Sequence, residues 1–183
     1  MLNSEGTYEN DCLIMRRSQK SLFMVCPTQQ QTRIMEWMES HLEGFKSVSL
    51  QDKTSMFTIM TLVGPKAKDM MTEICETEVD MQPFTFRFFN MRFLFSLHSP
   101  HFFGLFFVML SFFFFFSYAS GVMAVAITQT GEPGYSLYVP TESALHLYDK
   151  LMRIGVNYGI RNVGQLVYRC VCKYLDFQNN QSS

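Results

Sequence analysis

The feature that most limits the fold of this chain is a long run without charged side chains. Residues 93–131 contain no Asp, Glu, Lys or Arg, and 15 of the 19 phenylalanines lie between Phe84 and Phe116. The densest part, residues 102–118, is just long enough to cross about 30 Å of hydrocarbon as a helix. Any fold predicted for this chain must bury the run, place it in a membrane or exclude it.

Three interpretations of the run stay open. Hydropathy alone predicts a membrane-spanning segment, and burial as a core helix is a second reading. The third, which we favour, is that residues 90–116 are translated intron sequence or a gene-model error. Natural spans favour Leu, Ile, Val, Ala and Gly, whereas Phe112–Phe116 are five consecutive phenylalanines, coded by the pyrimidine-rich triplets typical of sequence before a splice acceptor. Ordinary globular sequence resumes at residue 117.

Length, charge and cysteine content narrow the class of protein. A chain of 183 residues is long enough for one domain with a real core. The net charge of −1 provides no broad basic face, so we expect no nucleic-acid partner. The five cysteines are odd in number and include no Cys-x-x-Cys, which gives a zinc site little support. We expect all five to be reduced thiols in a non-oxidising compartment, and a secreted disulfide scaffold is the alternative. Cys170 and Cys172 would share one strand face, where a metal is the alternative to buried thiols.

The amino-terminal residues 1–9 are polar. They contain no apolar core of a signal peptide and no Arg-rich stretch typical of a transit peptide. We therefore expect either that the protein stays where it is made or that Met1 is not the natural start of the full product.

Apolar periodicity predicts strand pairs that alternate with helices. The predicted strands are residues 12–15, 21–25, 47–50, 56–62, 122–128 and 135–139. The predicted helices follow Pro27, Gly64-Pro65 and Thr141, and the third ends near Gly155. A repeated ββα order predicts an α+β domain, with a mostly antiparallel sheet and helices on one side.

Four short motifs flank the aromatic run. They are Met1-Leu2-Asn3 leading to Asn10-Asp11, Leu62-Val63-Gly64-Pro65, Thr130-Gly131-Glu132-Pro133-Gly134, and Tyr158-Gly159-Ile160-Arg161-Asn162-Val163-Gly164. In this order and spacing they resemble the folate-binding domain of the aminomethyltransferase (glycine-cleavage T-protein) family. The resemblance covers residues 1–89 and 117–164, leaves 90–116 as an insert and fades over the divergent tail 165–183.

Within that family the motifs look most like one branch, the regulatory subunits of pyruvate dehydrogenase phosphatase. The resemblance implies a mitochondrial-matrix location and the catalytic subunit of that phosphatase as a partner. Members of this branch also carry an FAD-binding domain upstream and a small barrel domain downstream. Neither is present between residues 1 and 183, so the resemblance implies that the chain is a fragment.

The resemblance assigns ligand contacts to the turn at residues 130–134. A folate pterin presents an N–H and an amino group side by side, and a carboxylate can accept both hydrogen bonds. Glu132 takes that role by resemblance, and Gly131 and Gly134 allow the tight turn that brings the backbone near the ring. The implied cofactor is tetrahydrofolate. The alternative is a solvated Glu132 in an ordinary hairpin turn.

A second site residue is implied near the amino terminus. Asp11 matches the second member of an Asp-Asp pair in which an aspartate assists one-carbon transfer, by steering protonation and stabilising a cationic iminium. Asn10 departs from the pair, so one charge is missing, and Gln129 stands where many members have Tyr. The alternative role for Asp11 is that of a turn residue.

These observations predict a regulatory or binding module built on a folate-binding-type domain, and not an enzyme. The first alternative is an active tetrahydrofolate-dependent aminomethyltransferase or demethylating domain. The second alternative is a small single-pass membrane protein, which depends on the aromatic run alone.

Overall fold

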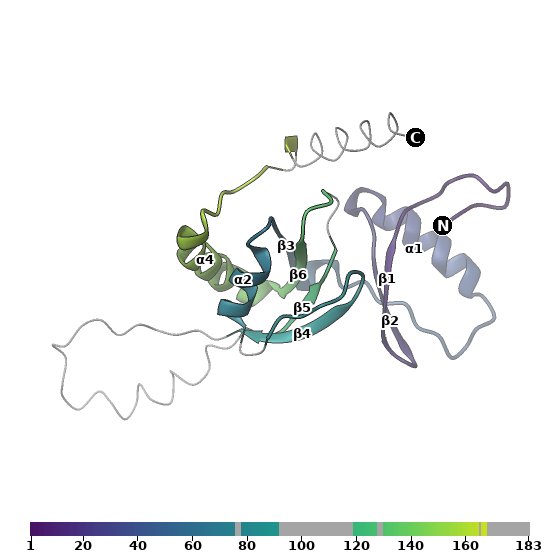
Figure 1. The fold of residues 1–183 in the computed structure, drawn as a ribbon. Helices are drawn as coiled ribbons and strands as arrows, with labels where there is room; N and C mark the ends of the chain where they lie inside the picture. The colour runs from purple at the N-terminus through teal and green to yellow at the C-terminus, as the bar shows by residue number, and fades with distance from the viewer. Residues whose placement is uncertain (76–77, 92–118, 128–129, 165, 168–183) are drawn as a thin grey trace, which may run out of the picture. The chain divides into compact units, whose positions relative to one another are not determined.

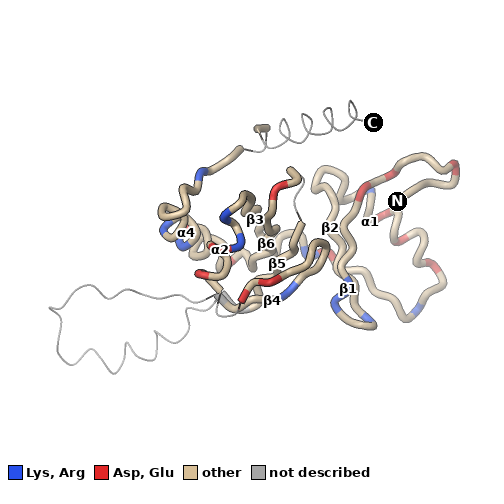
Figure 2. Tube along the Cα trace, viewed as in Figure 1, with Lys and Arg blue, Asp and Glu red and all other residues tan. Residues whose placement is uncertain are grey.

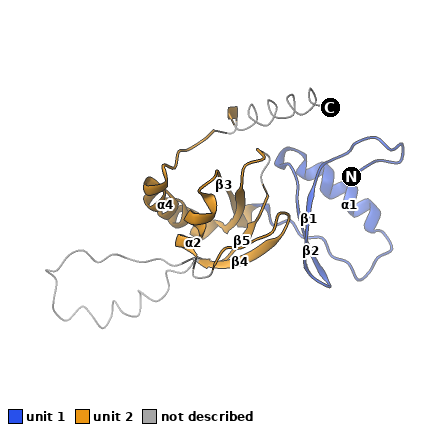
Figure 3. Ribbon diagram, viewed as in Figure 1, with its two compact units in different colours: residues 1–54 blue, residues 55–183 orange. Residues whose placement is uncertain are grey.

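The structure is a computed structural model that describes residues 1–75, 78–91, 119–127, 130–164 and 166–167 (Figure 1). The chain divides into two compact units, Met1–Thr54 and Ser55–Ser183, each described by itself (Figure 3). Positions of both charge signs are interspersed along the described elements (Figure 2). Several residues discussed above lie outside the described ones: segment 92–118, which holds the densest part of the aromatic run, Gln129, Cys170 and Cys172.

Unit 1 contains a hairpin and a helix. Strands β1 (Leu13–Ser18) and β2 (Ser21–Val25) pair antiparallel from Leu13 opposite Val25 to Ser18 opposite Ser21. This confirms the predicted hairpin, with β1 extended further into the turn. A single 3₁₀ turn, Thr28–Gln30, separates Pro27 from helix α1 (Gln31–Leu42), so the helix begins four residues after the proline.

The predicted strand at residues 47–50 is wrong, because this stretch consists of turns and irregular backbone. The N–H of Phe45 donates to the carbonyl of Leu42, and the N–H of Val48 donates to the carbonyl of Phe45. Gly44 between them has φ +99, which ends the helix in a left-handed conformation. The second of these turns commits the Val48 N–H, which a strand ladder through residues 47–50 could otherwise use.

Unit 2 is built on a four-stranded antiparallel sheet. Its strands are β3 (Phe57–Val63), β4 (Phe86–Met91), β5 (Ala119–Val125) and β6 (Gly134–Pro140). Their order across the sheet is β3-β6-β5-β4, so β3 and β4 form the two edges. Strands β3, β5 and β6 were predicted to within a few residues, whereas β4 was missed.

Helices α2 (Ala67–Ile74) and α4 (Ala144–Gly155) cover one face of this sheet (Figure 1). Alternate residues of β5 and β6 point toward them and form one buried cluster with the apolar stripes of the helices. The fully buried members of this cluster are Met70, Met71, Ile74, Val79, Val122, Ala124, Leu137, Val139 and Leu147. The predicted α+β class, with an antiparallel sheet and helices on one side, is confirmed. Helix α2 begins at Ala67 and not at Pro65, which lies in the preceding turn.

Segment 92–118 connects two neighbouring antiparallel strands. The last pair of the β4–β5 ladder joins Met91 to Ala119. Strand β4 includes Asn90 and Met91, so it runs two residues into the range predicted as the insert. Among the described residues, no helix is both long and apolar enough to cross a membrane.

Candidate functional site

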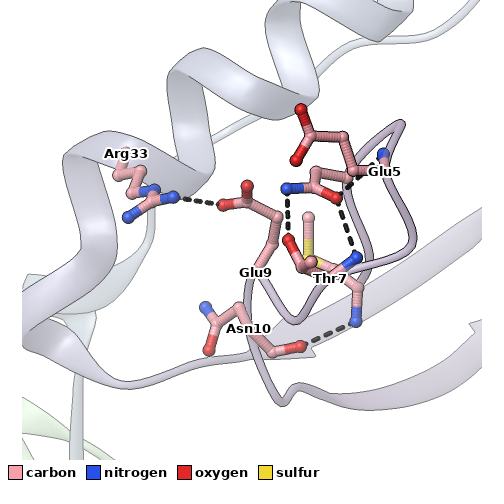
Figure 4. A network of polar contacts seen from close by, with 7 residues as sticks. Glu5, Thr7, Glu9, Asn10 and Arg33 are labelled. Atoms are coloured by element: carbon pink, nitrogen blue, oxygen red, sulfur yellow. Dashed lines mark hydrogen bonds and ion pairs between the residues drawn. The ribbon is translucent and has the colours of Figure 1, made fainter.

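The amino-terminal loop of unit 1 is folded around the side chain of Asn3. The Asn3 Oδ1 accepts hydrogen bonds from the backbone N–H groups of Glu5 at 3.1 Å and Thr7 at 2.9 Å (Figure 4). Gly6 has φ +76, which lets the chain reverse direction between them. The loop then returns to its own start, where the Met1 amino group donates to the carbonyl of Asn10 at 2.7 Å.

An ion pair connects this loop to helix α1. A carboxylate oxygen of Glu9 lies 2.5 Å from a guanidinium nitrogen of Arg33. The Glu9 side chain is 15% exposed but that of Arg33 is 68% exposed, so water screens the pair from the Arg33 side, as it does a surface pair. Figure 4 shows the Arg33 side chain extending from α1 toward the loop.

A very small pocket lies beside this ion pair, with a cavity volume of about 10 Å³. It is lined by Met1, Glu9, Asn10, Arg33, Ile34 and Trp37. Ligand pockets for drug-sized molecules usually measure about 300–1,000 Å³. The pocket by itself can therefore hold about one water molecule, and neither a pterin ring nor a complete folate fits in it as it stands.

Asn10 is the unusual residue of the pocket. It is 2% exposed, and neither its Oδ1 nor its Nδ2 has a hydrogen-bond partner among the described residues. A buried amide without partners costs about 1–3 kcal/mol, so such groups commonly face water or a ligand. Asp11, the residue that the sequence predicted for catalysis, is exposed to solvent instead. At the two adjacent positions that match the Asp-Asp motif, the buried one thus holds the neutral amide of Asn10 and the exposed one holds the carboxylate of Asp11.

The second predicted site lies in unit 2, in the connection from β5 to β6. Gly131 has φ +74, so the turn does require a glycine there. Gly134 begins β6 opposite Val63 and has no positive φ, so its backbone is that of an ordinary strand residue. The N–H of Gly64 donates to the carbonyl of Pro133 at 2.9 Å, which ties the turn to the end of β3. Glu132 is exposed on this anchored turn.

Thr130, just before this turn, resembles Asn10 in its environment. It is 9% exposed, and its hydroxyl has no hydrogen-bond partner within the described ranges. Sequence reasoning placed Thr130 in the motif but gave it no role, and it treated Asn10 only as a missing charge. The polarity of both residues within apolar surroundings was the available signal, but their burial could not be read from the sequence.

Asp11 and Glu132 belong to different compact units, and the structure describes each site within its own unit. The described part of the chain contains no group of three His, Cys, Asp or Glu side chains placed to hold a metal ion. The roles of Asp11, Gly131, Glu132 and Gly134 therefore stay predictions.

Comparison with known proteins gives a consistent family. The model of the GCVT N-terminal domain matches residues 1–99. The chain is 37% identical over 169 residues to the mitochondrial pyruvate dehydrogenase phosphatase regulatory subunit of Mus musculus, covering 92% of this chain and 17% of that protein. It is 25% identical over 165 residues to the aminomethyltransferase of Chlorobium limicola, covering 90% of this chain and 39% of the relative. The aminomethyltransferase of Chlorobaculum tepidum is 27% identical over 164 residues, with 90% and 38% covered.

The aligned regions extend over both compact units, although this chain spans less than a fifth of the regulatory subunit and about two fifths of the aminomethyltransferases. The matched family model covers more than half of the chain, including the Asn10-Asp11 and Gly64-Pro65 motifs. The chain therefore belongs to the GCVT N-terminal domain family.

Proposed function

We propose that this chain is part of a mitochondrial regulatory subunit of the pyruvate dehydrogenase phosphatase type, in which a GCVT domain binds a ligand without catalysing aminomethyl transfer. The observation that carries the proposal is the burial of Asn10 without a hydrogen-bond partner among the described residues. The 37% identity to a regulatory subunit, against 25% and 27% to the two aminomethyltransferases named above, points the same way.

The chemistry of an amide explains why the pocket would bind but not catalyse. A buried carboxylate can accept a proton or stabilise a developing cation, which is what one-carbon transfer from folate needs. An asparagine amide has neither the charge nor a titratable proton, but it offers one acceptor and two donor hydrogens. Asn10 can therefore orient a heterocycle by hydrogen bonds, but it cannot itself act as an acid or a base.

Tetrahydrofolate, or a part of it, is the proposed ligand. The Asn10 amide can pair with the neighbouring donor and acceptor groups of a pterin edge. Glu132, in unit 2, is a separate candidate, whose carboxylate would accept a pair of pterin hydrogen bonds. Because the pocket of unit 1 has room for only about one water molecule, a pterin ring at Asn10 would have to displace that water and widen the pocket, and the rest of a folate would need other surfaces. We propose no FAD contact for this chain.

The alternative is an active tetrahydrofolate-dependent aminomethyl or demethylating domain. It is favoured by the presence of Glu132 in the turn motif and of Asp11 next to the pocket residue. The alternative requires Asp11 to act from an exposed position, where water competes for its hydrogen bonds and charges are strongly screened.

Calorimetric titration with tetrahydrofolate tests the proposal on the full chain. Asn10→Leu, which keeps the approximate volume and removes the amide, should weaken binding about tenfold or more, since a hydrogen bond to a buried group is lost. Glu132→Gln keeps the shape but loses the charge, and should cost about 1.5–3 kcal/mol. Asp11→Asn is the matched control on the exposed neighbour and should leave the affinity within about twofold of the parent.

Three outcomes discriminate the readings. Weak binding by Asn10→Leu with normal binding by Asp11→Asn supports the ligand-binding regulatory domain. Turnover of an aminomethyl donor by the parent, abolished by Asp11→Asn, would establish the enzymatic alternative. No folate binding by the parent would remove the ligand and leave only an interaction role.

The partner is tested separately. We propose that the regulatory assembly includes the catalytic subunit of pyruvate dehydrogenase phosphatase. Surface plasmon resonance with that subunit immobilised should give saturable binding of the full chain. The absence of binding would assign the contact to parts of the regulatory subunit beyond the 17% of its length that this chain matches.

A further inference from the structure

Two cysteines lie at opposite positions just beyond the open end of the β1–β2 ladder, where the thiol of Cys12 donates to Sδ of Met1 at 3.4 Å. The last pair of the ladder joins Leu13 to Val25, so Cys12 and Cys26 occupy the next opposite positions. Side chains at directly opposite positions of an antiparallel pair point to the same face, with Cβ atoms about 4.5–5.5 Å apart. Neither cysteine is in a disulfide, and each is half-buried.

The backbone on both sides of the pair favours a close approach. Pro27 restricts the preceding residue, Cys26, to extended conformations, so the direction of β2 continues through this position. The backbone of Asn10, two residues before Cys12, is held by the Met1 amino group. A disulfide needs Cβ atoms about 3.5–4.5 Å apart, which a small adjustment at the end of a ladder can supply.

We propose that Cys12 and Cys26 form a reversible disulfide that closes the open end of this hairpin. The oxidant is a small disulfide of the glutathione class. A thiolate of the pair attacks glutathione disulfide, which gives a mixed disulfide and one glutathione thiolate. The second cysteine then displaces the other glutathione, so two thiols become one disulfide and two glutathione molecules are released.

The surroundings of the pair make this exchange slow. Burial raises the pKa of the Cys12 thiol, and the negative charge of Asp11 adds to the effect, while the amino terminus opposes it. Burial also raises the pKa of Cys26, with further contributions from Cys12 and Asp52. The fraction of reactive thiolate at neutral pH is therefore small, so the pair suits slow equilibration with a thiol pool better than rapid peroxide sensing.

The disulfide would restrict the strand that leads out of the unit 1 pocket. Asn10 lines that pocket, and only Asp11 separates it from Cys12. Closing the hairpin would fix the backbone that positions the Asn10 amide. The disulfide does not depend on the identity of the pocket ligand, so it can be tested apart from the proposed function.

The test uses the full chain with Cys170→Ser and Cys172→Ser, which leaves Cys12, Cys26 and the buried Cys75. After incubation with glutathione disulfide and trapping of free thiols, the thiol count should fall from three to one. Trypsin cuts after Arg16, Arg17 and Lys20, between the two cysteines, so the disulfide appears as two linked peptides in mass spectrometry. Adding a reductant should separate them.

A matched variant makes the result decisive. In the same background, Cys12→Ser should accumulate a mixed disulfide of Cys26 with glutathione, because the resolving thiol is gone. Linked peptides in the parent together with the mixed disulfide in the variant support the proposal. Stable glutathione adducts on both cysteines of the parent would overturn it, because the thiols would then be reachable but not paired. Full retention of three free thiols would overturn it as well.

Discussion

Replacing segment 92–118 by an Asn-Gly turn should stabilise unit 2. The segment joins two strands that are already antiparallel neighbours, and the residues that flank it, Met91 and Ala119, are paired. A two-residue type I′ turn is the shortest connection that matches the twist of such a hairpin, and Asn-Gly is its preferred sequence. The change keeps every described pair of the β4–β5 ladder and removes the densest part of the aromatic run.

The magnitude follows from the entropy of closing the loop. The cost grows as about (3/2)RT ln n, so shortening a connection of about 27 residues to two saves about 2 kcal/mol. Removing the exposed aromatic residues of an unfolded or partly folded chain should also raise the soluble yield. The assay is urea denaturation followed by far-UV circular dichroism, with the yield measured after centrifugation.

A shifted deletion is the control. Removing residues 90–116 instead deletes Asn90 and Met91 from β4 and leaves two residues of the aromatic run before Ala119. That variant loses the Met91–Ala119 pair and should be less stable than the Asn-Gly variant. If the Asn-Gly variant were less stable than the parent, the segment would be contributing contacts of its own and the argument from loop closure would be refuted.

Two further predictions concern the core of unit 2. A Cβ added at Gly155 would lie 2.4 Å from Cγ2 of Ile160, whose N–H donates to the Gly155 carbonyl. Gly155→Ala should therefore lower the free energy of unfolding by about 1–2 kcal/mol, after allowing for the better helix propensity of alanine. Gly164→Ala, which places its Cβ more than 4 Å from any other atom, is the control in chemical denaturation, and equal stability of the two variants would contradict the packing argument. Burial raises the pKa of Cys75 to about 11 from an ordinary value of 9.0, so above pH 9 the unfolded chain ionises first and the free energy of unfolding should fall between pH 9 and 11. Measured urea midpoints should fall less steeply with pH for Cys75→Ala than for the parent, and identical slopes would show that this thiol does not contribute.

The elements that the sequence predicted well are those with a strong local pattern. The helix ending at Gly155 has its apolar side chains on one face, and Leu147 and Leu151 are buried as such a pattern requires. The β1–β2 hairpin was recognised because a polar turn separates two short apolar runs. In these cases local periodicity and tertiary packing favour the same structure.

The errors occurred where local pattern and tertiary structure diverge. Strand β4 was missed because Phe86, Phe88 and Phe89 merge into the aromatic run, and only its pairing with β5 distinguishes it. Residues 47–50 have a strand-like composition, but turn hydrogen bonds commit their neighbours. The candidate site was predicted by charge, which favoured Asp11, whereas burial singles out Asn10, and burial depends on contacts that a sequence does not display.

The strand order of unit 2 has a consequence for synthesis of the chain on the ribosome. Strand β3 leaves the ribosome first, yet its hydrogen-bonding partner β6 is made only after α2, β4, segment 92–118 and β5. Strand β3 pairs with β6 from Phe57 opposite Pro140, so the hydrogen bonds between the two strands cannot all form until Pro140 has emerged. Sheets that depend on such distant pairings form slowly. The nascent chain therefore presents an unpaired strand and the phenylalanine-rich run during the same interval, which is when nascent-chain chaperones would be most needed.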